Sequence, residues 1–332
     1  MSDNTYLKQL TVAGLAVCAF GAAWMLWRRS KQARRTMVAV GKVSGLFIYP
    51  VKSCARIEVQ SGKCCRIGLI SGILKDRHWM VVDGENTFMT IGKEPRMCLI
   101  QPSLSEDERY LYLDAVNMPR LKVPIDYNEI QDSGQEIIQT RVWRHDIKGK
   151  YCGKEAAEWI NTFLGKTDFK LLVLDDLPPS LCSEDPKYSV FAQEGDIIAY
   201  QNNSPYLVLG EASVEDLNRR LDNPVSMKNF RPNIALSGMT AHEEDNWTFM
   251  QIGDALFRRY KYCQRCKITT VDPQTGIMHK SEPMKTMKSY RLCNDDPESK
   301  SMYGQSPLFG VNMAIVEEGT VNVGDTVYAC YD

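Results

Sequence analysis

Short runs rich in β-branched and aromatic residues dominate the chain from about residue 42 to residue 144. Gly, Asn and Asp punctuate these runs, which cover residues 43–49, 63–70, 79–82, 110–113 and 137–143. Runs of this length between turn-forming residues are typical of β-strands. A helix is predicted next, over residues 154–164, because its apolar residues recur at helical spacing and Gly165 can end it.

The second half of the chain mixes one helical pattern with several strand-like ones. A helix is predicted at 212–221, where Ser213 and Asp216 stand at capping-box-like spacing. Strands are predicted at 233–236, 256–260 and 267–271, and two more within 319–331 around the turn Val323-Gly324-Asp325. Residues 175–189 contain three prolines and several acids without apolar periodicity, as in a linker.

These patterns predict a β-rich α+β fold with two barrel-like domains that carry a few peripheral helices. The first domain is predicted at 42–174 and the second at 190–332, with the linker 175–189 between them.

An uncharged apolar run at 10–27 follows a short N-terminal tail at 1–9. As a helix, its 18 residues would span roughly 27 Å, enough for the apolar core of a bilayer. The linker that follows, 28–41, carries Arg28, Arg29, Lys31, Arg34 and Arg35, which predicts a transmembrane anchor with the remainder in the cytosol. The alternative is a cleaved secretory signal, but a signal carries its positive charge before the apolar run.

Composition and charge narrow the class of protein. The formal net charge of -1 argues against a dedicated nucleic-acid binder, which is usually strongly basic. The 11 cysteines show no disulfide framework and fit a reducing compartment. The four histidines form no i, i+4 pair, so a histidine-built metal site is not predicted.

The sharpest local motif is Tyr262-Cys263-Gln264-Arg265-Cys266. A structural zinc site would need a second ligand pair, and the sequence shows none. A thioredoxin-like pair would precede a helix, whereas a strand is predicted here. Two ordinary buried cysteines remain possible. A single activated thiolate beside Arg265 fits better, because the guanidinium favours the thiolate and a thiolate suits a transition metal.

Cations and amides recur in four other short segments. These are Tyr49-Pro50-Val51-Lys52-Ser53-Cys54, Asp76-Arg77-His78, Asn202-Asn203-Ser204-Pro205 and Asn229-Phe230-Arg231-Pro232-Asn233. If they converge, they make an oxyanion-binding site. No dinucleotide-binding glycine motif, phosphate loop, Gly-x-Ser-x-Gly elbow or His-Glu-x-x-His motif is present, so a direct nicotinamide site is not supported.

Together with Glu211-Ala212-Ser213, Arg265-Cys266, Thr269-Thr270-Val271-Asp272-Pro273 and Ser306-Pro307-Leu308-Phe309-Gly310, these segments resemble the MOSC superfamily. Within it, the chain is most similar to the mitochondrial amidoxime-reducing family. The resemblance implies a MOSC-like N-terminal β-barrel domain, a C-terminal MOSC β-barrel and a molybdenum cofactor (molybdopterin) between them. It implies that Cys266 is the catalytic thiolate on molybdenum. The implied cofactor-binding residues are Lys52, Ser53, Arg77, Asn203, Ser204, Arg231, Asn233, Gln264, Arg265 and Asn312.

The resemblance also implies an activity, partners and a location. The activity is reduction of N-hydroxylated small molecules, with electrons passed from NADH through cytochrome b5 reductase and cytochrome b5. The location is the mitochondrial outer membrane, with the domains facing the cytosol. Two alternatives stay open: a MOSC-type sulfur or molybdenum-cofactor carrier without reductase activity, and a membrane-tethered scaffold with an inert cysteine pair.

Overall fold

Seven strands close into a β-barrel that draws on both ends of the chain. The structure is a computed structural model that describes residues 36–132, 134–293 and 297–331. The barrel order is β16-β15-β19-β18-β17-β21-β1, closed by pairing of β1 with β16. Its strands are β1 (Val38–Ile48), β15 (Tyr206–Gly210), β16 (Ile234–Ser237), β17 (Trp247–Ile252), β18 (Ala255–Gln264), β19 (Leu308–Glu317) and β21 (Thr326–Tyr331), and β2 (Ile57–Val59) extends the sheet beside β1. The first strand of the described chain is therefore part of the same sheet as the last.

The remaining strands form smaller sheets. One sheet has the order β20-β3-β4-β5, a second β10-β11-β12-β6 and a third β7-β8-β9. Their bounds are β3 (Ser61–Cys65), β4 (Gly68–Ser71), β5 (Leu74–Lys75), β6 (Trp79–Val82), β7 (Gln101–Leu104), β8 (Tyr110–Asp114), β9 (Leu121–Pro124), β10 (Ile137–Val142), β11 (His145–Tyr151), β12 (Lys170–Val173) and β20 (Gly319–Asn322); β13 (Ser180–Leu181) pairs with β14 (Ile197–Ile198). Strand β10 alternates exposed and buried residues along its length, the pattern of a sheet with one solvated face.

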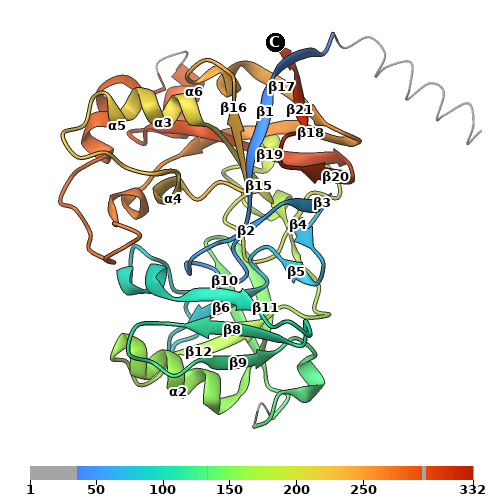
Figure 1. The fold of residues 1–332 in the computed structure, drawn as a ribbon, viewed down its shortest axis with the longest axis vertical. Helices are drawn as coiled ribbons and strands as arrows, with labels where there is room; N and C mark the ends of the chain where they lie inside the picture. Colours follow the sequence, from blue (N-terminus) through green and yellow to red (C-terminus); the bar gives the residue numbers. More distant parts are fainter. Residues whose placement is uncertain (1–35, 133, 294–296, 332) are drawn as a thin grey trace, which may run out of the picture. The chain divides into compact units, whose positions relative to one another are not determined.

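The helices lie beside these sheets, most of them toward the edges of the view in Figure 1. They are α2 (Gly153–Leu164), α3 (Glu211–Asn218), α4 (Met227–Phe230), α5 (Met284–Tyr290) and α6 (Pro297–Tyr303). The predicted helix at 154–164 is confirmed as α2, which buries one apolar face and ends at Gly165 in the left-handed conformation.

Four local predictions were wrong. Residues 63–70 form a hairpin of β3 and β4, not one strand. Residues 267–271, predicted as a strand, begin with the 3-10 helix Lys267–Thr270, whose Thr269 and Thr270 hydroxyls donate to the carbonyls three residues earlier. Strand β18 continues to Gln264, four residues beyond the predicted end. Helix α3 begins at Glu211, so Ser213 lies inside the helix and does not cap it; the Ser213 hydroxyl donates instead to the buried Glu244 carboxylate at 3.0 Å.

Residues 39–332 form one compact unit with a continuous core. Side chains from the barrel, such as Trp247 and Met313, belong to the same buried cluster as Trp79 and Trp159 from the other sheets. The structure confirms a β-rich α+β fold and closes one barrel with a strand from the N-terminal half.

The predicted anchor at 10–27 lies outside the described residues. Among the residues that are described, no helix is both long and apolar enough to cross a membrane.

Candidate functional site

A cavity of about 570 Å³ opens between the barrel and the smaller sheets, and every predicted site residue lines it. These residues are Lys52, Ser53, Arg77, Asn203, Ser204, Arg231, Asn233, Gln264, Arg265, Cys266 and Asn312. They come from six separate stretches of the chain, so the fold brings together what the sequence presents as scattered motifs. Their roles toward a cofactor remain predictions.

Lys52 stands in the turn that follows β1, with its ammonium buried. The ammonium donates to the Tyr200 carbonyl at 2.7 Å and to Asn202 Oδ1 at 2.6 Å. Burial lowers its pKa well below the ordinary lysine value, and the nearby cations Arg77 and Arg231 lower it further. An anion bound beside it would offset both effects. The next residue, Ser53, has a positive φ of 74° and also faces the cavity.

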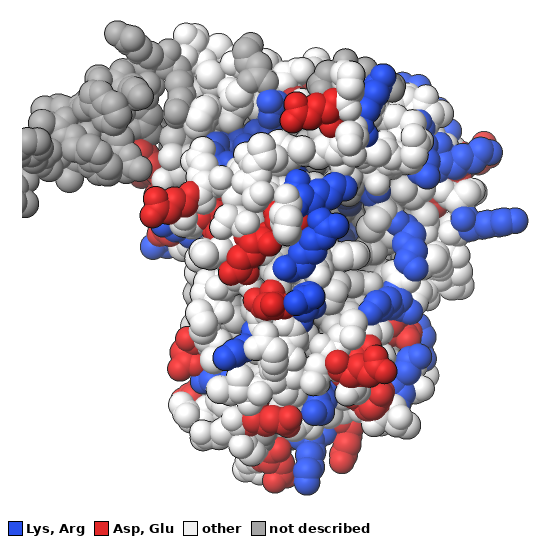
Figure 2. Space-filling model, turned by 180° about the vertical axis from the view of Figure 1, so that it is seen from behind, with Lys and Arg blue, Asp and Glu red and all other residues white. Residues whose placement is uncertain are grey.

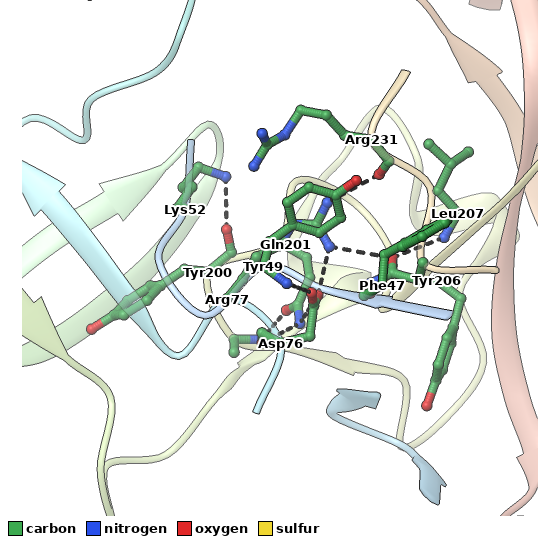
Figure 3. Close-up of polar contacts among 12 residues, drawn as sticks. Phe47, Tyr49, Lys52, Asp76, Arg77, Tyr200, Gln201, Tyr206, Leu207 and Arg231 are labelled. Atoms are coloured by element: carbon green, nitrogen blue, oxygen red, sulfur yellow. Dashed lines mark hydrogen bonds and ion pairs between the residues drawn. The ribbon is translucent and has the colours of Figure 1, made fainter. Parts of the chain in front are cut away.

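Arg77 is held by a buried carboxylate. Its guanidinium pairs with Asp76 at 2.5 Å and donates to Asn233 Oδ1 at 3.2 Å. The other Asp76 oxygen accepts the backbone N–H of Tyr49 at 2.9 Å, which ties the end of β1 to this pair. Figure 3 shows Asp76 at the centre of these contacts. Arg77 therefore reaches the cavity in a fixed orientation.

Arg231 follows α4 at its C-terminal end, in the left-handed conformation. A capping box between Ser226 and Asn229 fixes the start of this short helix. The guanidinium stacks 4.2 Å from the centre of the Tyr49 ring, and its buried Nη2 has no hydrogen-bond partner within the described chain. Burial lowers the pKa of Arg231 to about 10. Its guanidinium and the Lys52 ammonium point into the same space (Figure 3).

The Cys266 loop follows β18 and is tied down by Arg265. The Arg265 guanidinium donates to the Phe230 carbonyl at 2.6 Å and contacts Cys263 Sγ at 3.0 Å, while its backbone N–H donates to Pro307 at 2.8 Å. Two thiols line the cavity: Cys266 is exposed and Cys263 is half-buried, in contact with the Arg265 guanidinium. Cys266 is thus the more accessible of the two, and Arg265 holds the loop that carries it.

The amide and hydroxyl residues divide into two kinds. Asn233 and Gln264 are already bonded within the protein: Asn233 Nδ2 donates to Phe47 at 3.2 Å, and Gln264 Nε2 donates to Tyr303 at 3.0 Å. The Ser204 hydroxyl donates to Tyr206 at 3.0 Å. No side-chain hydrogen bond within the described chain is found for Asn203 or Asn312, which therefore have free polar groups for a ligand.

These donors fit an anionic, sulfur-ligated cofactor. The buried guanidinium nitrogen of Arg231 has no partner in the described chain, and an anion such as phosphate would satisfy it. Cys266 offers one accessible soft ligand in the same cavity. No group of three His, Cys, Asp or Glu side chains that could hold a bare metal ion is found among the described residues. The site fits a metal brought by an organic carrier better than a metal held by protein alone.

Sequence reasoning missed several residues that line the same cavity. These are Trp143, Arg144, Asp185, Lys187, Tyr188 and Lys261. Three of them lie in the predicted linker, and Lys261 lies just beyond the predicted end of its strand. The two-residue spacing of Lys261, Cys263 and Arg265 was the one signal that could have pointed to Lys261. On one face of the molecule, basic side chains gather near the middle with acidic ones beside them (Figure 2).

Comparison with known proteins extends over almost the whole chain. Residues 40–167 match the MOSC N-terminal beta barrel domain, and residues 195–328 match the MOSC domain. The chain is 41% identical over 320 residues to mitochondrial amidoxime-reducing component 1 of Mus musculus, covering 96% of this chain and 91% of that protein. It is 40% identical to the Homo sapiens protein of the same name, with 96% and 92% covered. It is 39% identical to mitochondrial amidoxime reducing component 2 of Rattus norvegicus, with 97% and 94% covered.

Proposed function

Because the chain belongs to the family of mitochondrial amidoxime-reducing components, we propose that it is a molybdenum-cofactor-dependent reductase of N-hydroxylated compounds. The observation that carries the proposal is one cavity that holds both an accessible thiol, Cys266, and a buried, partnerless guanidinium nitrogen of Arg231. The substrates are amidoximes, hydroxylamines and N-oxides, which become amidines or amines.

The overall reaction of an amidoxime consumes two electrons and two protons. The N–O bond breaks, nitrogen gains a proton in its place, and the oxygen leaves as water. When bound, the cofactor supplies this two-electron removal of oxygen from nitrogen. The remaining work belongs to the protein, which binds the cofactor, orients it and admits the substrate.

The protein residues take distinct roles in the proposal. Lys52, Ser53, Arg77 and Arg231 bind the anionic end of the cofactor, since each presents a donor to one side of the cavity. Cys266 is the protein ligand to the metal. The guanidinium of Arg265 holds the Cys266 loop against Phe230 and so fixes the position of the thiolate. Asn203, Ser204, Asn233, Gln264 and Asn312 complete the cavity wall.

Electrons come from partner proteins in this proposal, because the sequence carries no nucleotide-binding motif. We propose NADH, cytochrome b5 reductase and cytochrome b5 as the donors, and the mitochondrial outer membrane as the location. The support is the mitochondrial name of the relatives and the basic N-terminal segment of the sequence. Such electron-transfer partners dock through small, charged interfaces.

The test compares the full chain with its Cys266→Ala variant, both produced in a host that makes molybdenum cofactor. We expect near-stoichiometric molybdenum and pterin in the parent, with reduction of benzamidoxime by NADH, cytochrome b5 and its reductase. The variant should lose turnover by several orders of magnitude and keep much of the pterin, because Lys52, Arg77 and Arg231 are intact.

A matched control is Cys330→Ala, which removes a half-buried thiol on β21, outside the cavity lining. It should keep both cofactor and turnover. A molybdenum-loaded parent without turnover would instead favour a cofactor or sulfur carrier, and a parent without molybdenum would overturn the proposal.

A further inference from the structure

A second cationic centre lies in the same cavity, built around the ring of Tyr188. The Lys261 ammonium lies 4.2 Å from the centre of this ring, and the Lys187 ammonium lies 5.2 Å from it. All three residues line the cavity, and we call them the Tyr188 cluster. They come from β18 and from the segment before β14, not from the elements that carry Lys52, Arg77 and Arg231.

Lys261 is buried but is not paired with an acidic side chain. The residue is 3% exposed, and no hydrogen bond or ion pair to its ammonium is found within the described residues. A buried ammonium is costly unless it is paired, and cation–π contact with Tyr188 offsets only part of that cost. A buried cation that faces a cavity in this way is suited to receive an anion from a ligand.

The acid near Lys261 is already engaged elsewhere. Asp185 Oδ1 accepts the backbone N–H of Lys187 at 2.9 Å and pairs with Arg144 at 3.3 Å. Burial lowers the pKa of Lys261 to about 8, with Lys187 adding to the shift and Cys263 and Asp185 opposing it. The ammonium is therefore mostly charged at neutral pH and its charge is only partly balanced.

The ring of Tyr188 is itself held in place. Its hydroxyl donates to Gln264 Oε1 at 2.5 Å, and Gln264 also donates to the Tyr303 carbonyl at 3.0 Å. Gln264 precedes Arg265 and Cys266, so the Tyr188 cluster is linked to the segment that carries the thiol. A ligand bound at Lys261 would therefore share the cavity with the reacting end of the site.

We propose that Lys261 binds a carboxylate of the substrate, so that the enzyme prefers N-hydroxylated compounds that carry an acidic group. This inference rests on the proposed reductase function and names its substrate class. Lys187, at the exposed side of the same ring, attracts the carboxylate from solvent, while Lys261 pairs with it in the cavity.

The first test measures binding without turnover, on the cofactor-loaded full chain. Benzoate and benzamide have nearly the same shape and differ in charge, so calorimetric titration of both isolates the effect of the carboxylate. In the Lys261→Gln variant we expect at least a tenfold loss of benzoate affinity relative to benzamide. Lys261→Arg should keep part of the benzoate preference. The control Lys122→Gln, which removes an exposed lysine of β9, should keep the parent's values.

The second test measures turnover of benzamidoxime and of its 4-carboxylate. In the parent, kcat/KM should favour the carboxylate, and Lys261→Gln should lower the ratio of the two values about tenfold. Equal losses for charged and neutral ligands would overturn the inference. So would loss of molybdenum and pterin from Lys261→Gln, since Lys261 would then hold the cofactor. Charge-selective binding without turnover of either compound would leave the carboxylate site standing and remove the reductase function.

Discussion

Three residues of the predicted anion site have backbone conformations that side chains rarely adopt. Ser53, Arg77 and Arg231 have φ values of 74°, 50° and 59°. The left-handed conformation costs roughly 1 kcal/mol for a residue with a Cβ, so the surrounding contacts must stabilise it. Such positions usually carry Gly or Asn, so a Ser or Arg gives no sign of this conformation. The sequence therefore identified these residues as site candidates but did not predict their backbone geometry. It also gave no role to Asp76, whose partners are fixed only by the fold.

The Asp76–Arg77 pair predicts how much stability is lost when the buried charge of Asp76 is removed. Asp76→Asn keeps the shape of the side chain but removes the charge that Arg77 pairs with, at a residue that is 3% exposed. We expect a loss of about 3 kcal/mol in the free energy of unfolding, measured in urea, together with weaker pterin retention. The control Asp114→Asn breaks the exposed pair with Arg120 and should leave stability nearly unchanged. Equal effects of the two substitutions would contradict this interpretation.

Because His78 is buried, we expect the free energy of unfolding to fall in mild acid. Burial lowers its pKa to about 4, with Lys75 contributing, whereas an unfolded histidine titrates near 6.5. The folded state therefore binds fewer protons than the unfolded state between these values, and stability falls as pH drops from about 6.5 to about 4. The full contribution is about 3 kcal/mol. His78→Gln should flatten the pH dependence of the unfolding free energy in this window; an unchanged slope would rule out His78 as its source.

At the scale of elements, the bounds of an amphipathic element could be predicted more accurately than those of an element that is buried along most of its length. Helix α2 buries one face and ends at a glycine, so its bounds followed from the sequence within one residue. Strand β18 is mostly buried along its length and lacks clear alternation, so its extension to Gln264 could not be predicted. That missing extension is the reason Lys261 was overlooked. Residues 267–271 have strand-forming composition, but the backbone turns there and threonine hydroxyls satisfy its carbonyls.

Two glycines, one that ends α2 and one inside β19, allow the cost of a strained backbone to be compared with the cost of a steric clash. Gly165 and Gly310 both have positive φ, 68° and 75°. A Cβ at Gly165 meets nothing within 4 Å, whereas a Cβ at Gly310 lies 2.8 Å from the Val208 carbonyl oxygen, where β19 passes β15. We expect Gly165→Ala to cost about 1 kcal/mol and Gly310→Ala about 3 kcal/mol in thermal or urea unfolding. Similar losses for both would mean that the close contact with β15 relaxes easily.

At the scale of the whole molecule, the sequence predicted the β-rich class. It did not predict that strands from the two halves of the chain pair in the same sheets. Short-range patterns carry no information on which distant strands pair. The structure pairs Leu46 of β1 with Ile234 of β16, and Thr320 of β20 with Lys63 of β3. Sheets therefore connect the region that matches the N-terminal domain with the region that matches the MOSC domain.

Shared strands predict that the two regions depend on each other for folding. A fragment of residues 190–332 lacks β1, so the edges of β16 and β21 would be unpaired and prone to association. We expect this fragment to be aggregated or poorly ordered by size-exclusion chromatography and circular dichroism, and a fragment of residues 36–174 added during refolding to restore native signals. A monomeric 190–332 fragment with a cooperative thermal transition would contradict the prediction.

Because its first strand closes the barrel, the barrel can form only late in the synthesis of the chain. Strand β1 leaves the ribosome early and can pair at once with β2, but its barrel partners β16 and β21 emerge only after residues 234 and 326. At roughly 5–20 residues per second, β1 must wait on the order of ten seconds or more for them. The cavity needs Lys52 as well as Asn312, so it is complete only when translation is nearly finished. We therefore expect the proposed cofactor to bind only after synthesis of the chain is nearly complete.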